Sequence, residues 1–276
     1  MQIVGSVLVR NEDVFVEQAI RNVASFCDRI HALDHRSSDR TWEILRALAR
    51  ELDHLELERS GDATRSHLRL EQYAGTPTWV LGVDGDELYD PTGLARLRER
   101  LLVGEYSDRF RLKAHVLHCE ALDRTVGVAR GYLAPPSRAV TKLFNFDAIE
   151  SWPGGWERLH GPTPTFRRGY DWDSWRTLVD ETTWETDPLR ALHLCFLRRS
   201  SRDCDDVALG RRNLAETGLY RRGVLGALRR AVRQPLASEQ MKVIEARGAT
   251  WKRDKYRRGD PVTVDARPFF GGPLQP

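Results

Sequence analysis

The first ninety residues alternate between short apolar runs and stretches with helical periodicity, and this alternation restricts the possible folds more than any other feature of the sequence. Strands that alternate with helices predict a parallel sheet with helices on both of its faces. We therefore expect an α/β fold with a Rossmann-like, mostly parallel sheet. The predicted strands are 3–9, 29–34, 55–58 and 78–83, and the predicted helices are 13–26, 42–52 and 62–73.

The remainder of the chain has a less regular pattern. Strands are predicted at 110–120, 139–146 and 189–198, and a connecting segment that contains Gly and Pro lies at 127–138. Five tryptophans fall in the loop-rich stretch 152–184, and helical periodicity returns beyond residue 200. We therefore predict a domain at 1–200 with halves at 1–118 and 119–200, a basic helical extension at 201–258, and an irregular tail at 259–276 that is rich in Pro and Gly.

The composition is that of a soluble globular protein. Mean hydropathy is −0.51, and no stretch approaches the roughly 18 uncharged apolar residues that a membrane span needs. The N-terminus has no basic region followed by a cleavage site, which favours a strand over a signal peptide. The four cysteines form no C-x-x-C pair and are too few for a disulfide framework. We therefore expect reduced thiols and a cytoplasmic location.

Positive charge is concentrated toward the C-terminus. Residues 190–258 hold 18 basic and 7 acidic side chains, although the whole chain has a formal net charge of only +3. This asymmetry predicts an anionic partner such as nucleotide phosphates, an anionic membrane surface or nucleic acid. Within this region, 221–233 has apolar residues on one helical face and arginines on another. Such a helix either lies on a membrane surface or packs on the domain, and the sequence leaves both interpretations open.

Polar clusters follow three of the predicted strands. Arg10-Asn11-Glu12 follows the first strand, Asp34 ends the second, and Asp84-Gly85-Asp86-Glu87 follows the fourth. Because ligands of parallel sheets bind beyond the carboxyl ends of the strands, we expect these loops to line one crevice. Two carboxylates separated by one Gly repel each other unless a cation lies between them, and oxygen ligands suit Mg²⁺ or Mn²⁺ shared with phosphates. The alternative is a turn that caps the helix after Pro91.

The order, spacing and strand context of these segments resemble those of the family 2 glycosyltransferases, which have the GT-A fold. Residues 7–12 resemble the family's strand ending in Lys-Asn-Glu, 33–41 its Asp-x-Gly-Ser-Thr-Asp-x-Thr turn, and 79–87 its strand running into D-x-D. The resemblance covers about the first 90 residues and weakens beyond them. It implies the fold of the nucleotide-diphospho-sugar transferases and a glycosyltransferase of the hexosyltransferase type (EC 2.4).

The resemblance also implies roles for individual residues. Asp34 matches the acid that accepts hydrogen bonds from the nucleobase, Arg65 matches a helix arginine near the phosphates, and His193 lies where a late histidine reaches the metal or diphosphate. Glu12 either binds the donor sugar or ribose, or supports the following helix. The implied nucleotide-sugar site consists of Val9, Arg10, Asn11, Glu12, Asp34, Arg65, Asp84 and Gly85, and the implied Mn²⁺ or Mg²⁺ ligands are Asp84, Asp86 and His193.

The chain also departs from the family pattern. Ser37-Ser38 replaces the usual Gly-Ser, which leaves the identity of the donor base open. The segments 142–144 and 158–160 resemble an Arg-x-Phe strand and a Val-His-Glu motif, but Gly161 stands where the family has Glu, which leaves the acceptor-side base open. The acids considered for that role are Glu157, Asp171 and Asp173, of which Glu157 and Asp173 are retained as catalytic candidates.

Glu157 is favoured because Gly154-Gly155-Trp156 before it combines a flexible hinge with an aromatic platform for a sugar. The alternative places Trp152 and Trp156 in the core and Glu157 on the surface. In an inverting transfer, a carboxylate or histidine takes the proton of the acceptor hydroxyl while cations hold the leaving diphosphate.

We therefore expect a metal-dependent, inverting glycosyltransferase that moves a sugar from a UDP-, GDP- or dTDP-sugar to a hydroxyl of a glycan, lipid carrier or small molecule. One alternative is a haloacid-dehalogenase-type phosphatase that uses Asp84 and Asp86, although Glu87 and the three preceding strands are atypical of that class. A nucleotidyltransferase is disfavoured, because the Gly-rich loop of that class is missing from this sequence. A non-catalytic sugar or nucleic-acid binder is the third alternative, but no nucleic-acid-binding module is recognisable.

Overall fold

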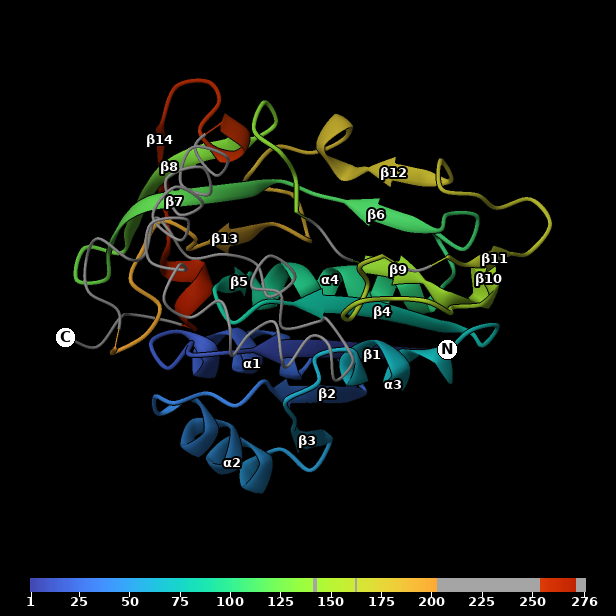
Figure 1. Ribbon diagram of the computed structural model, residues 1–276. Coiled ribbons are helices and arrows are strands. Elements are labelled where there is room, and N and C mark those ends of the chain that lie inside the picture. Colours follow the sequence, from blue (N-terminus) through green and yellow to red (C-terminus); the bar gives the residue numbers. More distant parts are fainter. Residues whose placement is uncertain (141–142, 162, 203–253, 272–276) are drawn as a thin grey trace, which may run out of the picture.

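A seven-stranded sheet forms the centre of the computed structural model, which describes residues 1–140, 143–161, 163–202 and 254–271 (Figure 1). Four of its strands pair in parallel in the order β3-β2-β1-β4, and the fold is therefore mixed α/β with a mostly parallel central sheet. The predicted strands of the first ninety residues are confirmed. Their bounds are β1 (Gln2–Val9), β2 (Arg29–Asp34), β3 (Leu55–Arg59) and β4 (Thr78–Val83).

Helices cover both faces of this sheet because alternate side chains of each strand point to opposite sides. Ile3 and Val7 of β1 belong to the core cluster that contains the buried residues of α1, α2 and α4, whereas Val4 belongs to the cluster that contains Leu70 of α3. The predicted helices are confirmed, with shorter bounds at both ends of the first and third. The observed helices are α1 (Val16–Ala24), α2 (Thr41–Glu51), α3 (Arg65–Glu71) and α4 (Pro91–Leu102).

The sheet continues beyond β4 with shorter strands. β9 (Leu143–Asn145) runs antiparallel between β4 and β6 (Arg111–Lys113), and β12 (Trp175–Thr177) pairs with β6 at the edge. β10 (Ile149–Ser151) and β11 (Thr165–Phe166) form a separate two-stranded sheet. The predicted strand at 139–146 is therefore observed only over its C-terminal part. The short helical turns of this region are η1 (Phe146–Ala148) and η2 (Leu178–Asp180).

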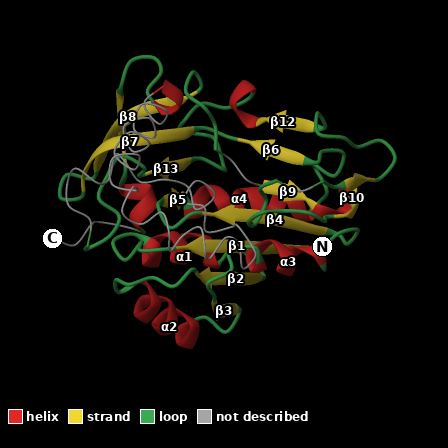
Figure 2. Cartoon of the chain, in the orientation of Figure 1, coloured by secondary structure: helices red, strands yellow, loops and turns green. Residues whose placement is uncertain are grey.

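A second, five-stranded sheet has the order β14-β8-β7-β13-β5 and lies at the upper left of Figure 2. The prediction of one strand at 110–120 is wrong: the chain changes sheets there, from β6 to β7, and the His115 amide donates to the Asp187 carboxylate in between. The predicted strand at 189–198 is observed only as β13. The strands are β5 (Glu87–Tyr89), β7 (Val116–Asp123), β8 (Val128–Ala134), β13 (Ala191–His193) and β14 (Val262–Asp265).

The segment 127–138 was expected to be a connection, and that expectation is wrong because most of it is strand β8, paired with β7. Gly131 stands opposite Cys119, next to the point where the register of the two strands shifts. A Cβ atom at Gly131 would lie 2.1 Å from the His118 carbonyl oxygen. The glycine therefore permits a close approach of two backbones inside a sheet and does not mark a loop.

The prediction of an irregular tail from Gly259 is also wrong. β14 pairs antiparallel with β8, and the short helix η4 (Arg267–Phe270) places a fully buried Phe269 against Trp184, with ring centroids 5.8 Å apart. Pro268 lies in the first turn of η4 and Gly271 ends it in the left-handed conformation. Both residues act here as helix-boundary residues.

Most of the predicted helical extension at 201–258, including the two helices expected in it at 205–233 and 239–247, lies outside the described residues, which resume at residue 254. The basic segment 221–233 and its two interpretations therefore remain a prediction. Within the described ranges, no helix combines the length and the apolar character needed to cross a membrane.

Candidate functional site

The loops that follow β1 and β4 meet where the order of the sheet reverses. From β1 the chain builds the sheet toward β2 and β3, and it then crosses to β4 on the other side of β1. Ligands of open α/β sheets bind beyond the carboxyl ends of the strands at this switch point. A Cβ atom at Gly85 would lie 2.8 Å from the Glu12 Cβ and 3.0 Å from a methyl group of Val9. The two loops are therefore in contact, and only glycine fits between Asp84 and Asp86.

The loop after β1 is bound to the loop after β2. Asn11 has a φ of 55°, a left-handed conformation that Asn tolerates better than most residues. Its amide donates to the Ser37 hydroxyl (2.9 Å) and its side-chain oxygen accepts from the Ser38 amide (2.8 Å). The Glu12 amide donates to the Thr41 hydroxyl (2.8 Å). These bonds bring the predicted residues Asn11 and Glu12 to the same end of the sheet as Asp34.

Asp34 is fully buried at the end of β2. Its carboxylate accepts from the Ser37 amide (3.1 and 3.2 Å) and pairs with the Arg59 Nε (2.9 Å). Its neighbour His35 is also buried, and its Nδ1 has no hydrogen-bond partner among the described residues. Burial lowers the pKa of His35, so this ring is neutral at pH 7. His35 cannot be predicted as a site residue from the sequence, because a single His in a polar loop carries no distinctive pattern.

The D-x-D turn joins the two sheets, because β4 belongs to the first and β5 to the second. Across the second sheet, β13 pairs with both β5 and β7 in a register that sets His193 opposite Glu87 and opposite His118. The Leu194 amide donates to the Asp86 carbonyl (2.8 Å), and His193 Nε2 lies 3.8 Å from Asp86 Oδ2. The structure therefore brings His193 to the D-x-D turn, 107 residues along the chain from Asp86.

Hydrogen bonds assign the tautomer of His193. Burial, followed by the neighbouring His193, lowers the pKa of His118 well below its usual value, so His118 is neutral. Its Nε2 donates to the Arg138 carbonyl (2.9 Å), which makes its Nδ1 the acceptor of the 2.8 Å bond to His193 Nδ1. The neutral form of His193 therefore carries its lone pair on Nε2, the nitrogen that faces Asp86. This arrangement of a second group that orients a ligating imidazole is common in metal sites.

A buried arginine pairs with each aspartate of the D-x-D turn. Arg158 forms an ion pair with Asp84, and Arg199 forms one with Asp86 and lies 3.5 Å from a Glu12 oxygen. Although burial opposes charge on both arginines, the neighbouring carboxylates more than compensate and raise their pKa values, so both stay charged. Neither arginine can be predicted as a site residue from local sequence, because their partners lie 74 and 113 residues away in the chain.

The residues at the turn suit a divalent cation. Asp84 and Asp86 place two carboxylates one residue apart in this turn, and His193 Nε2 lies 3.8 Å from Asp86 Oδ2. Carboxylate oxygens together with the imidazole nitrogen of His193 form a donor set that Mn²⁺ accepts. The residues therefore fit the predicted metal.

Glu157 is buried (7% exposed) and lies at the same end of the sheet. Its Oε1 is 3.1 Å from His160 Nδ1 and 3.6 Å from Arg158 Nη2. The alternative in which Glu157 is a surface acid and Trp156 is core is wrong for both residues, because Glu157 is buried and Trp156 is 59% exposed. Of the two tryptophans in that alternative, Trp152 belongs to the core and Trp156 does not.

Within the described part of the chain, two predicted site residues make their contacts outside this group. Arg65 begins α3, is largely exposed, and pairs with Glu58 of β3. Asp173 is exposed in the turn before β12, where its charge acts on Arg111 and Lys113 of β6. Asp171 belongs to the same turn and accepts from the Asp173 amide (2.8 Å). Three strands of the sheet separate β12 from β1, since β6, β9 and β4 lie between them.

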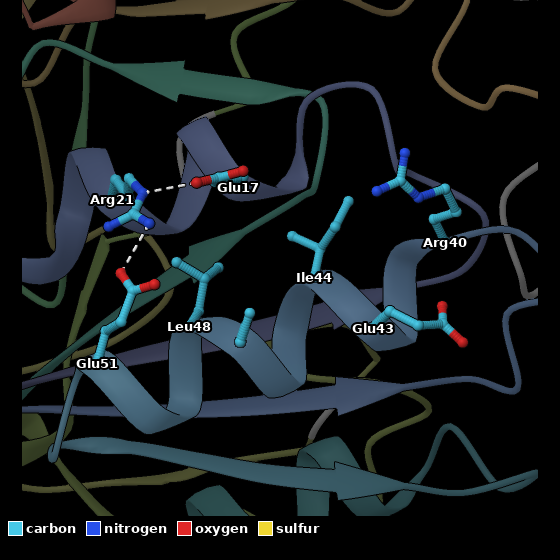
Figure 3. A pocket seen from close by; sticks show the side chains of 8 residues that line it. Glu17, Arg21, Arg40, Glu43, Ile44, Leu48 and Glu51 are labelled. Atoms are coloured by element: carbon cyan, nitrogen blue, oxygen red, sulfur yellow. Dashed lines mark hydrogen bonds and ion pairs between the residues drawn. The ribbon is translucent and has the colours of Figure 1, made fainter.

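A groove of about 250 Å³ lies elsewhere, between α1 and α2 (Figure 3). Its arginine Arg21 already pairs with Glu17 (2.9 Å) and Glu51 (2.8 Å). The groove contains none of the predicted site residues, and its paired surface charges leave it without an evident chemical role.

No protein-family model and no curated protein matches the sequence. Solved structures resemble parts of it. S. aureus TarS 1–349 in complex with UDP is 17% identical with a TM-score of 0.32, over 45% of this chain and 36% of that chain. Glucosyl-3-phosphoglycerate synthase from Mycobacterium tuberculosis, in complex with Mn²⁺, UDP-glucose and phosphoglyceric acid, is 16% identical with a TM-score of 0.39, over 83% of this chain and 79% of that chain.

The chain spans between 36% and 61% of the length of the first four solved structures that it matches. Both TM-scores are below 0.5, so the functional argument for this chain rests on its own site geometry.

Proposed function

We propose that this protein is a divalent-metal-dependent glycosyltransferase that uses a nucleoside-diphosphate sugar. The observation that carries the proposal is the position of Asp84-Gly85-Asp86: the turn follows β4 at the switch point of the sheet and contacts both Glu12 in the loop after β1 and His193 of β13 in the second sheet. A nucleotide bound beyond β1 and β2 has its phosphates directed toward this turn. The resemblance to family 2 glycosyltransferases supports the same donor class.

Asp84, Asp86 and His193 would hold the metal. When bound, the ion supplies positive charge that stabilises the leaving nucleoside diphosphate. Because an imidazole nitrogen belongs to the donor set, we propose Mn²⁺ in preference to Mg²⁺, which favours oxygen ligands.

The loops after β1 and β2 would bind the nucleoside. Asp34 is held by the Ser37 amide and the Arg59 guanidinium, so its carboxylate is fixed before the donor arrives and accepts a hydrogen bond from a base N–H. Val9, Arg10, Asn11 and Glu12 line the ribose and sugar side, together with Asp84 and Gly85. The proposed donors are UDP-, GDP- or dTDP-sugars.

The transfer would proceed with inversion in a single displacement. Glu157 takes the proton of the acceptor hydroxyl as that oxygen bonds to the anomeric carbon, and the bond from this carbon to the diphosphate oxygen breaks. The exposed ring of Trp156, adjacent in sequence, offers an apolar face to the acceptor. Asp173 is the less favoured base because its turn precedes the edge strand β12.

The test is calorimetric titration of UDP, GDP, ADP and dTDP into the protein with Mn²⁺ or with EDTA. We expect one nucleoside diphosphate to bind with micromolar affinity in Mn²⁺ and at least about tenfold more weakly in EDTA. Asp86→Ala should lose the metal-dependent part of the affinity. The matched control is Asp108→Ala, which removes a largely exposed carboxylate paired only at the surface with Arg109.

Product analysis then tests the reaction itself. Incubation of the corresponding sugar nucleotide should release the nucleoside diphosphate and free sugar, with water as acceptor, and Glu157→Gln should slow this release. Absence of binding by all four nucleotides in either condition would refute the proposal. Release of inorganic phosphate from phosphate monoesters would favour the phosphatase alternative.

A further inference from the structure

Arg158 has a backbone conformation that residues with side chains rarely adopt. Its φ is 38°, in the left-handed region. A β-carbon makes this region unfavourable, and such conformations persist where the surrounding structure enforces them, most often at functional sites.

Helix α3 enforces this conformation. The Arg158 amide donates to the Ser66 hydroxyl (3.0 Å), and the Arg158 carbonyl oxygen lies 2.8 Å from His67 Nδ1. The second ring nitrogen of His67 contacts the Trp152 carbonyl (2.9 Å) and the Gly155 amide (3.1 Å). A Cβ atom at Gly155 would lie only 1.9 Å from this ring. Two buried side chains of α3 therefore hold the loop 152–158 from both ends.

The side chain that results is a buried cation between two acids. One Nη atom donates to the Val83 carbonyl (3.0 Å) and pairs with Asp84, and the other lies 3.6 Å from Glu157. The Arg158 Nε is buried and has no acceptor among the described residues. Asp84 belongs to the donor side of the proposed site and Glu157 to the acceptor side.

We propose that Arg158 is a positioning residue that orients the carboxylates of Asp84 and Glu157 together. The inference rests on the proposed function. A planar guanidinium offers donors in a fixed fork, so the direction of one carboxylate is tied to that of the other. The strained backbone determines where the fork lies, and α3 holds that backbone in place.

A purely structural arginine would be an inefficient choice at this position. A buried ion pair gains little over apolar packing, and one buried donor of Arg158 lacks an acceptor among the described residues. The left-handed backbone adds a further cost. These three unfavourable features of Arg158 are explained if its function is to orient the carboxylates of Asp84 and Glu157.

The experiment is a double-mutant cycle between Arg158→Met and Asp84→Asn. The readout is the affinity, in Mn²⁺ and in EDTA, for whichever of UDP, GDP, ADP and dTDP binds the wild type most tightly. If Arg158 acts through Asp84, each single variant loses about tenfold or more of the nucleotide affinity in Mn²⁺. The double variant then binds no more than about threefold more weakly than the single variant with the lower affinity. Arg158→Lys should recover part of the affinity, because it keeps the charge.

A second cycle pairs Arg158→Met with Glu157→Gln and follows kcat for hydrolysis of the sugar nucleotide. Arg158→Gly tests whether misfolding explains the loss, because glycine adopts a φ of 38° without strain. This variant should unfold at a temperature equal to or above that of Arg158→Met and still lose nucleotide affinity. Arg176→Met is the matched control, since Arg176 pairs with Glu181 near the sheet edge, and its affinity should stay within twofold of the wild type.

Losses that multiply in the first cycle, to about a hundredfold in the double variant, would overturn the role of Arg158 at Asp84 while the proposed function stands. Losses that multiply in the second cycle would likewise remove its role at Glu157. A wild type that binds none of the four nucleotides would overturn the proposed function and this inference together.

Discussion

Gly85 is the residue at which the two halves of the D-x-D turn meet the loop after β1. The atoms that a Cβ would contact are the Cβ and Cγ of Glu12 and a methyl of Val9, and these lie close to the backbone and cannot swing away. The identity of the middle residue of D-x-D is thus determined in this chain by packing.

Gly85→Ala should therefore displace the loop after β1. We expect a loss of about 1–3 kcal/mol in the free energy of unfolding from overpacking, and nucleotide affinity weakened at least about tenfold. Urea unfolding and calorimetric titration measure the two effects. Gly61→Ala is the control: its Cβ would meet only the far end of the flexible Arg36 side chain, so both quantities should change little.

His35 makes the stability of the protein sensitive to acid. Its pKa lies below the ordinary value of 6.5 because the ring is buried, and burial lowers the pKa of His31 in the same way. Below about pH 6.5 the unfolded chain binds protons that the folded protein does not, so stability is full above this pH and declines as the pH falls.

We expect the free energy of unfolding to fall between pH 6.5 and pH 5, by at most about 1.4 kcal/mol per pH unit for each such histidine. His35→Asn should make this decline shallower. Urea titrations at three pH values measure the slope, and an unchanged slope in the variant would contradict the assignment.

The sequence identified the acids of the site more readily than their partners. Asp34, Asp84 and Asp86 directly follow or end apolar strands, so local pattern places them at one edge of the sheet. Arg158, Arg199 and His118 reach the site from segments without such a pattern, and only the paths of β7, β13 and the loop 152–158 bring them there. A contact between residues about a hundred positions apart has no local signal.

At the level of elements, the same contrast separates the long strands from the short ones. The long strands of the first sheet are buried on both faces and read as continuous apolar runs. β5, β6 and β13 have three residues each, too few for a period to be recognised, and β8 contains a glycine that the pattern reads as a turn. The parallel core was therefore predictable, and the boundaries of the shorter strands were not.

The tail offers a direct test of an element that sequence reasoning missed. Phe269 of η4 is fully buried, stacks on Trp184, and its carbonyl accepts from the buried Asn22 side chain of α1 (2.8 Å). Phe269→Ala should lower the free energy of unfolding by about 3–5 kcal/mol, measured in urea. Phe270→Ala, next in the chain and only half-buried, should cost clearly less. Equal effects would mean that the tail does not dock as described.

At the scale of the whole molecule, the site lies on the junction of the two sheets. β4 and β5 belong to different sheets and are connected by the D-x-D turn, and β13 of the second sheet contacts this turn through the Leu194 amide and His193. A ligand that binds Asp84, Asp86 and His193 together therefore contacts both sheets.

Nucleotide with Mn²⁺ should consequently stabilise the entire fold. At a ligand concentration of about one hundred times Kd, the expected gain is about 2.7 kcal/mol in the free energy of unfolding. Thermal unfolding should show one transition that moves upward with both ligands present. In His193→Ala the metal-dependent part of this shift should disappear, whereas two separate transitions would show that the sheets unfold independently.

The short strand β13 gives the site a dependence on chain length as well as on chemistry. Side chains alternate sides along a strand, so His193 faces Asp86 while its neighbour Leu192 in β13 faces the other way. Removing a single residue between Asp187 and Ala191 would slide the strand by one position and turn a leucine toward the aspartate. The sheet would still form, but the nitrogen donor would be lost. The number of residues in this short segment is therefore one of the requirements of the proposed catalytic site.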